Sequence, residues 1–574
     1  MAVNHLTRIL RGGTLQAHPT TLWDVGSWLD NTCRVSAVMV LIGLVGCGSH
    51  GGSDGAGASV GQPPPPRVAV SPLQATVAKN GALAFTATVT GADDGVAWSV
   101  EGGSANGSVD AAGMYTAPSV VPDAPVIVRA TSLADSRGTG TATVRVIVGG
   151  EALTVNPNRA LSPGGSTANT FSGGQRSVAI AGLTVYMVWN DNHSLTGDDD
   201  VYLSVSQNRG ATFGPVIRVN DDGTTAPQLA PSVAVDGAGR AVIVWLDARW
   251  NLDRTYDVYV ATVTVDPTGA VTVGKNQRVT AVGTNEDRDP SVALALDQSG
   301  NLYLAWGDGT NGDTDVMLTK GSRLASGAFN FTGAVRVHEY YLSDQSRPAV
   351  AVDSTGNVVI AWDDRQPIPG QIEQDWDVYW RRGRFDQFGA IEWTTRTEVR
   401  VNLETKGDQV SPSVAVGQNG VAYVAWGQQI GLERRKLYFA KSGLPDENGY
   451  LDMTVTANTE VLPAVDADQN FPSLVVRGDE VTIAFADNRG CLPPICAFDP
   501  FNPKGTGPTD VYLVRSVDGG ATFGPSLSVN DDLLALALHG RASVAVDDVG
   551  RAYVVWTDAR NDSSQAQAFM ARVE

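Results

Sequence analysis

One pattern of apolar and polar positions recurs along the chain from about residue 176 to the C-terminus. A run alternating small and β-branched residues, such as 232–235, is followed by a turn that ends in glycine, such as Gly239. A bulky apolar run with one aromatic residue comes next, and the glycine supplies the positive φ of a tight hairpin. The aromatic residues of the seven copies are Trp189, Trp245, Trp306, Trp362, Trp426, Phe485 and Trp556. A period of roughly 60 residues indicates one repeated supersecondary unit.

Two further apolar runs follow in most copies. The third run opens with Asp, as at Asp257 and Asp510, and a fourth, such as 216–220, ends the unit. Four short strands separated by turns predict an antiparallel blade. Small residues in the first strand suit the crowded centre where blades converge, and large residues in the second suit the wider gap between blades. Radial repetition of such blades predicts an all-β fold, a seven-bladed β-propeller.

The ends of the repeat region predict how the ring closes. The last copy stops after its third strand, at Val573, and an isolated strand-like stretch, 152–156, precedes the first copy. We expect this stretch to complete the last blade, which pairs the edges that would otherwise stay open. The propeller domain is therefore predicted to span 152–574.

The region 67–147 is predicted to form a separate β-domain. Short alternating strands with turns every ten residues or so are typical of a sandwich. The stretches 96–100 and 113–118 and the closing 142–146 resemble those of bacterial Ig-like domains, with Trp98 as the expected core residue. The resemblance implies an Ig-like spacer, preceding the propeller.

The front of the chain predicts export. Residues 35–46 are an apolar run that is too short to span a bilayer and suits a signal-peptide core. The run ends at Cys47 and resembles the bacterial lipobox, which implies that Cys47 is lipidated and that 1–47 is a leader. A chance apolar run with a buried cysteine is the alternative. Residues 48–66, rich in Gly, Ser and Pro, are predicted to be a tether.

The net charge of the chain limits the kinds of partner it can bind, and its cysteines bear on the compartment in which it resides. The net charge of −20 argues against nucleic acid, whose phosphates would be repelled. Cys491 and Cys496 lie close together in a long loop, and in an exported protein we expect them to form a disulfide. Two free thiols are the alternative. A lipid-anchored protein of the bacterial cell envelope, with a glycan or an envelope protein as partner, is the predicted setting.

Two copies carry a sharper signature between their third and fourth strands. The residues are Ser206, Asn208, Gly210, Thr212 and Phe213, and Ser516, Asp518, Gly520, Thr522 and Phe523. Both resemble the Asp box, or BNR repeat, of sialidases and related propellers, and the resemblance covers roughly 152–574. The box itself is expected to be structural, because its Asp or Asn caps turn amides. Known sialidases imply six blades, an arginine triad, a Tyr nucleophile with a Glu, and an Asp acid/base. This chain has seven copies and no Arg-Ile-Pro near the first, so the resemblance implies fold rather than activity.

An acid and a base follow the aromatic residue in several copies. They supply the candidate catalytic residues Arg249, Arg365, Arg489 and Asp364. In blade order these loops lie on the face opposite the Asp boxes, and arginine suits bidentate binding of a sialic or uronic acid carboxylate. The alternative is a structural clasp within each blade, between these arginines and the Asp that opens the third strand, namely Asp257, Asp377 and Asp510.

Two further groups are weaker candidates. Tyr340 and Tyr341 could provide a nucleophile beside a carboxylate, although loops of this composition are commonly just loops. An oxygen-rich stretch could hold Ca²⁺, with ligands Asp308, Asn311, Asp313 and Asp315, and so could 198–200. A solvated turn is the alternative for both stretches, and no other cofactor is expected.

The function predicted from these features is an exported envelope lipoprotein whose propeller binds a glycan or protein through the face opposite the Asp boxes. One alternative is an exo-α-sialidase-like glycoside hydrolase. A second alternative is an architectural envelope protein. Locking of Arg249, Arg365 and Arg489 by acids of their own blades would count against the hydrolase.

Overall fold

A computed structural model describes most of the chain after residue 64. The described residues are 65–574 without 92–94, 121, 123–124, 148–153, 165–166, 172, 193–197, 251–254, 281–290, 310–311, 341, 368–374, 396, 419, 431–433, 444–454, 456, 490–508, 533–538 and 562–564. Cys47, Tyr341, Asn311, Cys491 and Cys496 lie outside them, as do the leader and the tether. Within the described part, no helix has the length and apolar character needed to cross a bilayer.

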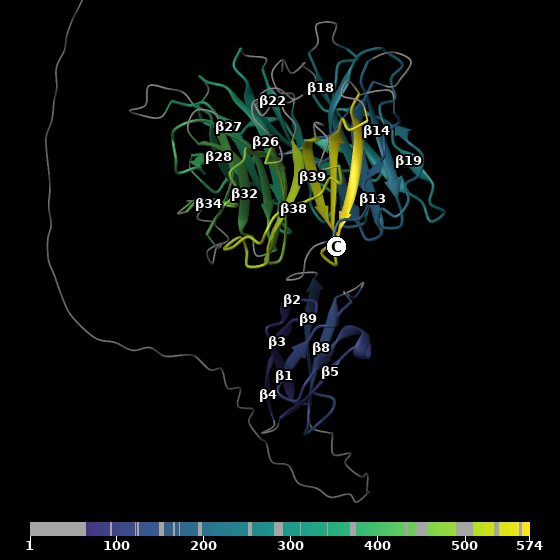
Figure 1. The fold of residues 1–574 in the computed structure, drawn as a ribbon, viewed down its shortest axis with the longest axis vertical. Helices are drawn as coiled ribbons and strands as arrows, with labels where there is room; N and C mark the ends of the chain where they lie inside the picture. Colours follow the sequence, from purple (N-terminus) through teal and green to yellow (C-terminus); the bar gives the residue numbers. More distant parts are fainter. Residues whose placement is uncertain are drawn as a thin grey trace, which may run out of the picture. The chain divides into compact units, whose positions relative to one another are not determined.

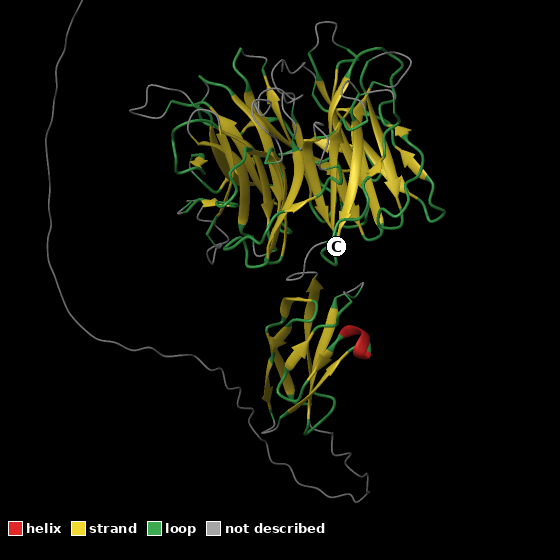
Figure 2. Ribbon diagram, viewed as in Figure 1, coloured by secondary structure: helices red, strands yellow, loops and turns green. Residues whose placement is uncertain are grey.

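Strands make up nearly all of the regular structure (Figure 2), and the one helical element described is a single 3₁₀ turn, Gly103–Asn106. The region 67–147 forms three small sheets around its own core. The strands are β1 (Arg67–Ser71), β2 (Gln74–Ala78), β3 (Ala82–Ala84), β4 (Thr86–Thr90), β5 (Val96–Val100), β6 (Ser108–Val109), β7 (Met114–Thr116), β8 (Val126–Ser132) and β9 (Thr139–Ile147), and the sheets are β2-β9-β8-β5, β3-β7-β6 and β1-β4. Tyr115 and Phe85 are fully buried in this core, and Trp98 packs against it from a partly buried position. Alternate burial along β8 shows why its sequence alternates.

Seven antiparallel sheets follow (Figure 1), one for each copy of the repeat. The first three are β11 (Ala168–Asn169), β12 (Val178–Ala181), β13 (Thr184–Asp191), β14 (Asp200–Ser206) and β15 (Ile217–Arg218); β16 (Gln228–Val235), β17 (Ala241–Asp247), β18 (Asp257–Val265), β19 (Val271–Val273) and β20 (Gln277–Arg278); and β21 (Val292–Leu296), β22 (Leu302–Asp308), β23 (Asp315–Arg323), β24 (Phe329–Phe331) and β25 (Val335–Arg336).

The other four sheets are β26 (Gln345–Val352), β27 (Asn357–Asp364), β28 (Asp377–Phe385), β29 (Ile391–Trp393) and β30 (Val399–Arg400); β31 (Gln409–Val416), β32 (Ala422–Ile430), β33 (Arg434–Lys441) and β34 (Thr459–Glu460); β35 (Gln469–Arg477), β36 (Glu480–Asp487), β37 (Asp510–Ser516) and β38 (Leu527–Ser528); and β39 (His539–Val546), β40 (Ala552–Asp558), β41 (Gln567–Val573) and β10 (Arg159–Ala160). We number these sheets as blades 1 to 7 in the order of the seven repeats.

The cores of this domain lie between neighbouring blades. Tyr186 of blade 1 and Trp245 of blade 2 share one cluster, and every residue of β17 is buried because both of its faces are covered. The same relation holds between the last blade and the first, where Val178 and Met187 pack with Tyr553 and Met570. Sheets that pack face to face in succession, with the last against the first, define a β-propeller.

The seventh blade takes its fourth strand from the N-terminal side of the repeats. Residues 159–160 pair with β41, and further upstream Thr154 and Glu574 exchange backbone hydrogen bonds of 3.1 and 2.9 Å. Asn158 donates its side-chain amide to the Val529 carbonyl at 3.0 Å, as Asn276 does to Val219 at 3.0 Å two blade boundaries further on. The same latch therefore joins blades 6 and 7 as joins blades 1 and 2. The pairing involves 154–160 rather than only the expected 152–156, whose first two residues are outside the description.

Serines of the first strands link the blades near the axis. The Ser413 hydroxyl accepts the Leu474 N–H at 3.0 Å, Ser473 accepts the Val544 N–H at 3.1 Å, and Ser543 accepts the Ser177 N–H at 3.1 Å. These bonds join blades 5 to 6, 6 to 7 and 7 to 1. They satisfy backbone donors at the inner edges of the sheets, which pair with no further strand.

The antiparallel order gives the propeller two different faces. The first-to-second hairpins and third-to-fourth turns lie on one face, which we name the Asp-box face, and the remaining connections lie on the other, which we name the loop face. In both Asp boxes the hydrogen bonds of the Asn208 and Asp518 side chains stay within the turn: they accept the N–H groups of Thr212 and Thr522 at 2.8 and 2.9 Å. The box thus stabilises a turn, and the bond from the Thr522 hydroxyl, together with these contacts, lowers the pKa of Asp518 to about 2.

Candidate functional site

A bulge near the start of the first strand turns one residue toward the axis in most blades. The residues with positive φ at this position are Ala230, Arg347, Ser411, Phe471 and Arg541, with φ between 39° and 59°. In each case the register of the first strand against the second shifts directly after this residue. A left-handed residue within a bulge redirects its side chain relative to the regular strand. Because first strands begin at the loop face, these side chains gather at the loop-face end of the axis.

The residue at the bulge varies among the copies, whereas the run that begins two residues after it is of one type. Small and apolar residues of the Ser-Val-Ala-Val type follow it throughout, whereas the bulge residue itself is Ala, Arg, Ser, Phe or Arg in the copies above. Gln175 occupies the matching sequence position in the first copy, and Asp289, outside the described residues, occupies it in the third. Variable side chains held on a constant frame are typical of binding sites.

The segment that enters blade 1, residues 170–171 and 173–176, crosses the axis inside the ring. We name it the inner segment. The Gly173 N–H donates to the Pro472 carbonyl at 3.0 Å, and the Thr170 N–H donates to the Thr557 hydroxyl at 2.8 Å. Arg176 donates to the carbonyls of Leu474 at 2.9 Å and Val414 at 3.4 Å, and its burial lowers its pKa to about 10. One short segment therefore binds blades 5, 6 and 7 from within.

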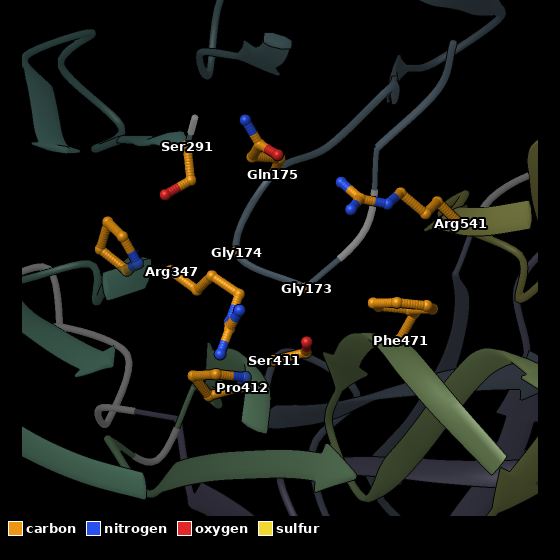
Figure 3. Close-up of a pocket in the computed structure, with 10 residues that line it drawn as sticks. Gly173, Gly174, Gln175, Ser291, Arg347, Ser411, Pro412, Phe471 and Arg541 are labelled. Carbon is orange, nitrogen blue, oxygen red and sulfur yellow. The ribbon is translucent and has the colours of Figure 1, made fainter. Parts of the chain in front are cut away.

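The inner segment separates two spaces on the axis. Toward the loop face lies a pocket, which we name the axial pocket, with a volume of about 30 Å³ (Figure 3); its lining residues are Gly173, Gly174, Gln175, Ser291, Arg347, Pro348, Ser411, Pro412, Phe471 and Arg541. Toward the Asp-box face lies a cavity of about 290 Å³ lined by Arg176 and by the ends of all seven first strands. The axial pocket has room for about two waters or one carboxylate-sized group. Two guanidinium groups line it, and none of its described lining residues is an acid.

Aromatic rings and one buried acid hold the two arginines of the axial pocket. The Arg541 guanidinium carbon lies 5.2 Å from the centroid of Phe471 and 5.9 Å from that of Phe171. The Arg347 Nε donates to Asp363, which is fully buried and also accepts the Ser411 N–H at 3.2 Å. Stacking on aromatic faces and the contact with Asp363 position these two guanidinium groups beside the pocket.

Arg365, a predicted candidate, lies beside this pocket. Its guanidinium carbon is 5.3 Å from the centroid of Trp376, and that of Arg347 is 5.4 Å from the same ring. Trp376 precedes β28 on the loop face, so a cationic and aromatic surface continues from the axial pocket over blade 4. The sequence pointed to Arg365 but gave no reason to select Arg347 or Arg541.

The predicted clasp exists for Arg249 and Arg489, as it does for Arg560 in blade 7, but its acid is a different one from the predicted Asp. Arg249 donates to Asp247 at 2.7 Å and to Asp221 at 2.7 Å, while Asp257 pairs with Arg278 at 2.7 Å. In blade 6, Arg489 likewise donates to the acid two residues before it, Asp487, at 2.6 Å. The reason is local geometry, since the same carboxylate also accepts the arginine's own N–H. The third-strand acids face the fourth strand instead, as in the bond from Asn530 to Asp510.

Asp364, the predicted acidic candidate, is buried below the loop face. Its carboxylate accepts hydrogen bonds from the indole N–H of Trp362 at 2.9 Å and from Gln345 at 3.0 Å. Burial raises the pKa of Asp364 to about 6, and it also raises those of Asp377 and Asp199 to about 6. Full burial and these hydrogen bonds describe a structural carboxyl rather than one open to a substrate.

The stability of the propeller is expected to rise as the pH falls from about 6 to about 4. Asp199, Asp364 and Asp377 have folded pKa values near 6, above the value of about 3.9 for an unfolded Asp. Between these limits the folded state binds more protons, so the free energy of unfolding increases on acidification, by roughly 1–2 kcal/mol per carboxyl. Urea unfolding at pH 7 and pH 5 measures this. Asp364→Asn should remove part of the difference, and an equal pH dependence in the variant would contradict the assignment.

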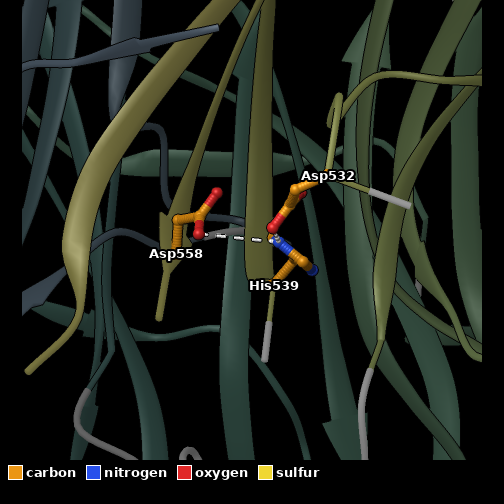
Figure 4. Close-up of side chains that lie close together, drawn as sticks. All are labelled: Asp532, His539 and Asp558. Carbon is orange, nitrogen blue, oxygen red and sulfur yellow. Dashed lines mark hydrogen bonds and ion pairs between the residues drawn. The ribbon is translucent and has the colours of Figure 1, made fainter. Parts of the chain in front are cut away.

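The predicted calcium ligands are only partly placed. Asp308 and Asp315 are paired across β22 and β23. Asp313 belongs to no group of described side chains that could hold a metal ion, and Asn311 lies outside the described residues. The one cluster of described residues with such geometry is Asp532, His539 and Asp558 (Figure 4), with His539 Nε2 3.0 Å from Asp532 and 3.5 Å from Asp558. Arg560 lies 3.2 Å from Asp532 and 2.6 Å from Asp558, so a cation already neutralises this cluster. His539 stands where Gln345 bonds to Asp364 in blade 4, which gives it the same structural role.

Tyr340 does not join the other candidates. The backbone carbonyl oxygen of Tyr340 accepts a hydrogen bond from Nδ1 of His338 at 2.5 Å. Burial lowers the pKa of His338 to about 4. No described contact brings the Tyr340 hydroxyl to a carboxylate. The site that the structure assembles is therefore the axial pocket, and its signal in the sequence is the variable residue two positions before the run of Ser-Val-Ala-Val type in each copy.

No family model and no curated protein matches the chain. Similar solved structures include a polysaccharide lyase titled a PL25 ulvan lyase, with TM-score 0.46 and 11% identity over 72% of this chain and 94% of that one. Trypanosoma rangeli sialidase gives TM-score 0.35 and 14% identity over 62% and 56%. The β-propeller domain of the Trilobed protease from Pyrococcus furiosus gives 0.37 and 12% over 70% and 94%. Because each TM-score is below 0.5, the propeller assignment rests on the sheets of this chain.

Proposed function

We propose that this chain is a seven-bladed propeller that binds an acidic glycan on its loop face, with a sugar carboxylate in the axial pocket. The observation that carries the proposal is that two guanidinium groups, those of Arg347 and Arg541, line one pocket on the axis. Charge-assisted and bidentate hydrogen bonds from guanidinium groups suit a carboxylate. The volume of about 30 Å³ admits this group but no sugar ring, so the rest of the glycan lies over the loop face.

Binding is favoured over glycoside hydrolysis by the arrangement of the candidate residues. Arg249 and Arg489 are held by Asp247 and Asp487, and Asp364 is enclosed. A hydrolase needs its acid and its nucleophile beside the bound sugar. Among the described residues, no acid lines the axial pocket that could supply either role.

The remaining features of the proposal concern the setting of the propeller. The region 67–147 serves as an Ig-like spacer, and Cys47 carries the lipid that anchors the chain to the bacterial envelope. The lipobox-like residues before Cys47 and the Gly/Ser/Pro-rich tether support this arrangement. A glycan of the cell surface or of the surroundings is then within reach of the loop face. Mass spectrometry of the protein from a bacterial membrane, with Cys47→Ser as the control, tests the anchor.

Arg541→Ala is expected to weaken binding of an acidic oligosaccharide by about 10- to 100-fold. The loss follows from removing one charge-assisted hydrogen bond of about 1.5–3 kcal/mol. The measurement is calorimetric titration of the full chain with a glucuronate-containing oligosaccharide and with its carboxyl-reduced counterpart. Arg240→Ala, which removes an arginine from a hairpin of the Asp-box face, is the matched control and should bind as the wild type does.

Three results would overturn this proposal. If the wild type binds the carboxyl-reduced glycan as tightly as the acidic one, the carboxylate is not what the protein recognises. If Arg541→Ala binds the acidic oligosaccharide as tightly as the wild type does, the axial pocket is not the binding site. Turnover of a fluorogenic sialoside that depends on Arg541 would replace binding by the hydrolase alternative. Circular dichroism of each variant separates a lost site from a lost fold.

A further inference from the structure

Trp250 is the one exposed tryptophan in the part of the chain that the structure describes. Its exposure is 68%, and it lies three residues after the end of β17, on the loop face of blade 2. Leaving a large aromatic side chain in water forgoes the stabilisation that burial of its apolar surface gives. Such a position calls for a reason outside the folding of the chain.

The indole of Trp250 is held in one orientation. Its Nε1–H donates to the Tyr259 hydroxyl at 2.6 Å. Tyr259 stacks on Trp245, with centroids 5.9 Å apart, and its ring lies 4.3 Å from the guanidinium carbon of Arg249. Arg249 is fixed in turn by Asp247 and Asp221. A ring whose orientation is set before a ligand arrives loses little entropy on binding.

The repeats provide an internal comparison. Blade 7 has the same Asp-Ala-Arg sequence, at 558–560, followed by Asn561, and blade 6 has Gly490 after Arg489. The acid, the arginine and their hydrogen bonds are present in those blades without an aromatic residue at this point. The frame of the blade therefore does not need Trp250.

We infer that Trp250 is a stacking site for a sugar ring, so that the ligand of the loop face is a glycan chain of several residues. This inference rests on the proposed function and deepens it. The indole N–H is engaged, so the ring offers its faces, and the C–H side of a pyranose covers such a face while removing apolar surface of both from water. The partly exposed carboxylate of Asp221, which is bonded to Arg249, suits the hydroxyl rim of a sugar.

A protein partner fits this position less well. Interface cores bring apolar residues together and are depleted of charge. Tyr259, which holds Trp250, stacks against Arg249, and Arg249 pairs with Asp221 and Asp247. The support of Trp250 is therefore a charged network rather than an apolar patch.

The test compares a long and a short acidic glycan on the full chain. Trp250→Ala is expected to lower the affinity for a glucuronate-containing hexasaccharide about tenfold, and to leave the affinity for the disaccharide within twofold. Trp250→Phe should keep most of the hexasaccharide affinity. The hexasaccharide should also change the tryptophan fluorescence of the wild type, and this change should be smaller in Trp250→Ala. Asn561→Ala, at the matching position of blade 7, is the control.

The outcomes separate this inference from the proposed function. If Arg541→Ala loses binding while Trp250→Ala binds both glycans as the wild type does, the stacking site is wrong and the axial pocket stands. If carboxyl-reduced and acidic hexasaccharides bind equally but both lose affinity in Trp250→Ala, the axial pocket is wrong and the stacking site stands. No binding of either hexasaccharide, or self-association of the wild type that Trp250→Ala abolishes, overturns the stacking site.

Discussion

Gly174→Ala is expected to lower the free energy of unfolding by about 3–5 kcal/mol. A Cβ at this position would lie 2.0 Å from the Pro348 carbonyl oxygen and 2.6 Å from the Ala349 Cα. Both neighbours are backbone of β26, so no side chain can rotate away. The inner segment would have to leave its place on the axis, together with the bonds that Gly173 and Arg176 make to blades 5 and 6. Urea unfolding followed by tryptophan fluorescence measures the change.

Gly223→Ala is the control for this substitution, because a Cβ there meets nothing within 4 Å. It should change the unfolding free energy by less than about 1 kcal/mol. The glycan titration adds a second readout, since Gly174 lines the axial pocket and its displacement reshapes the pocket floor. A Gly174→Ala protein with wild-type stability would show that the inner segment does not pack against blade 4 as described.

Asp363→Asn is expected to lower the free energy of unfolding by about 3 kcal/mol and to tighten the binding of acidic glycans. Asp363 is fully buried and accepts the Nε–H of Arg347, so the variant leaves the guanidinium without its buried counter-charge. The same loss of negative charge makes the axial pocket more positive. Stability and affinity therefore move in opposite directions, which a general loss of fold would not produce.

Asp466→Asn provides the comparison for Asp363. Asp466 also pairs with an arginine, Arg434, but its side chain is 78% exposed. An exposed pair of this kind contributes about 0–1 kcal/mol. We expect little change in stability or in glycan affinity. Weaker glycan binding by a well-folded Asp363→Asn protein would contradict this prediction and show that the position of Arg347, which Asp363 holds, governs the affinity.

The architecture of the blades follows from the sequence because it depends on short-range patterns. Alternation in the first strand, glycine in the hairpins and a bulky second strand are properties of neighbouring residues, and seven repetitions make them unmistakable. The turn contacts of Asn208 and Asp518 are likewise local, within four residues. Closure by a strand before the repeats could also be foreseen, because the last copy has no fourth strand of its own.

Which acids pair with the loop-face arginines could not be predicted from the sequence. Arg249 has an acid two residues before it and another, Asp257, eight residues after it, and the pattern of residue types suits both. The turn after β17 brings the nearer acid onto the guanidinium, and the farther one meets Arg278 across β18. Only the direction of each side chain at the blade edge distinguishes the two pairings.

The candidate site itself was decided by the tertiary structure. By itself, the sequence determined a chain of repeated four-stranded units, their two faces and the structural Asp boxes. Arg347 and Arg541 are separated by three blades, and they share a pocket only because closure of the ring carries every first strand to one axis. Both arginines have the left-handed backbone conformation of the bulge, which directs their side chains into the pocket. The inner segment, with Gly174 at a point where no Cβ fits, forms the pocket floor. Convergence of distant strands on one axis is a property of the closed ring, which no local pattern encodes.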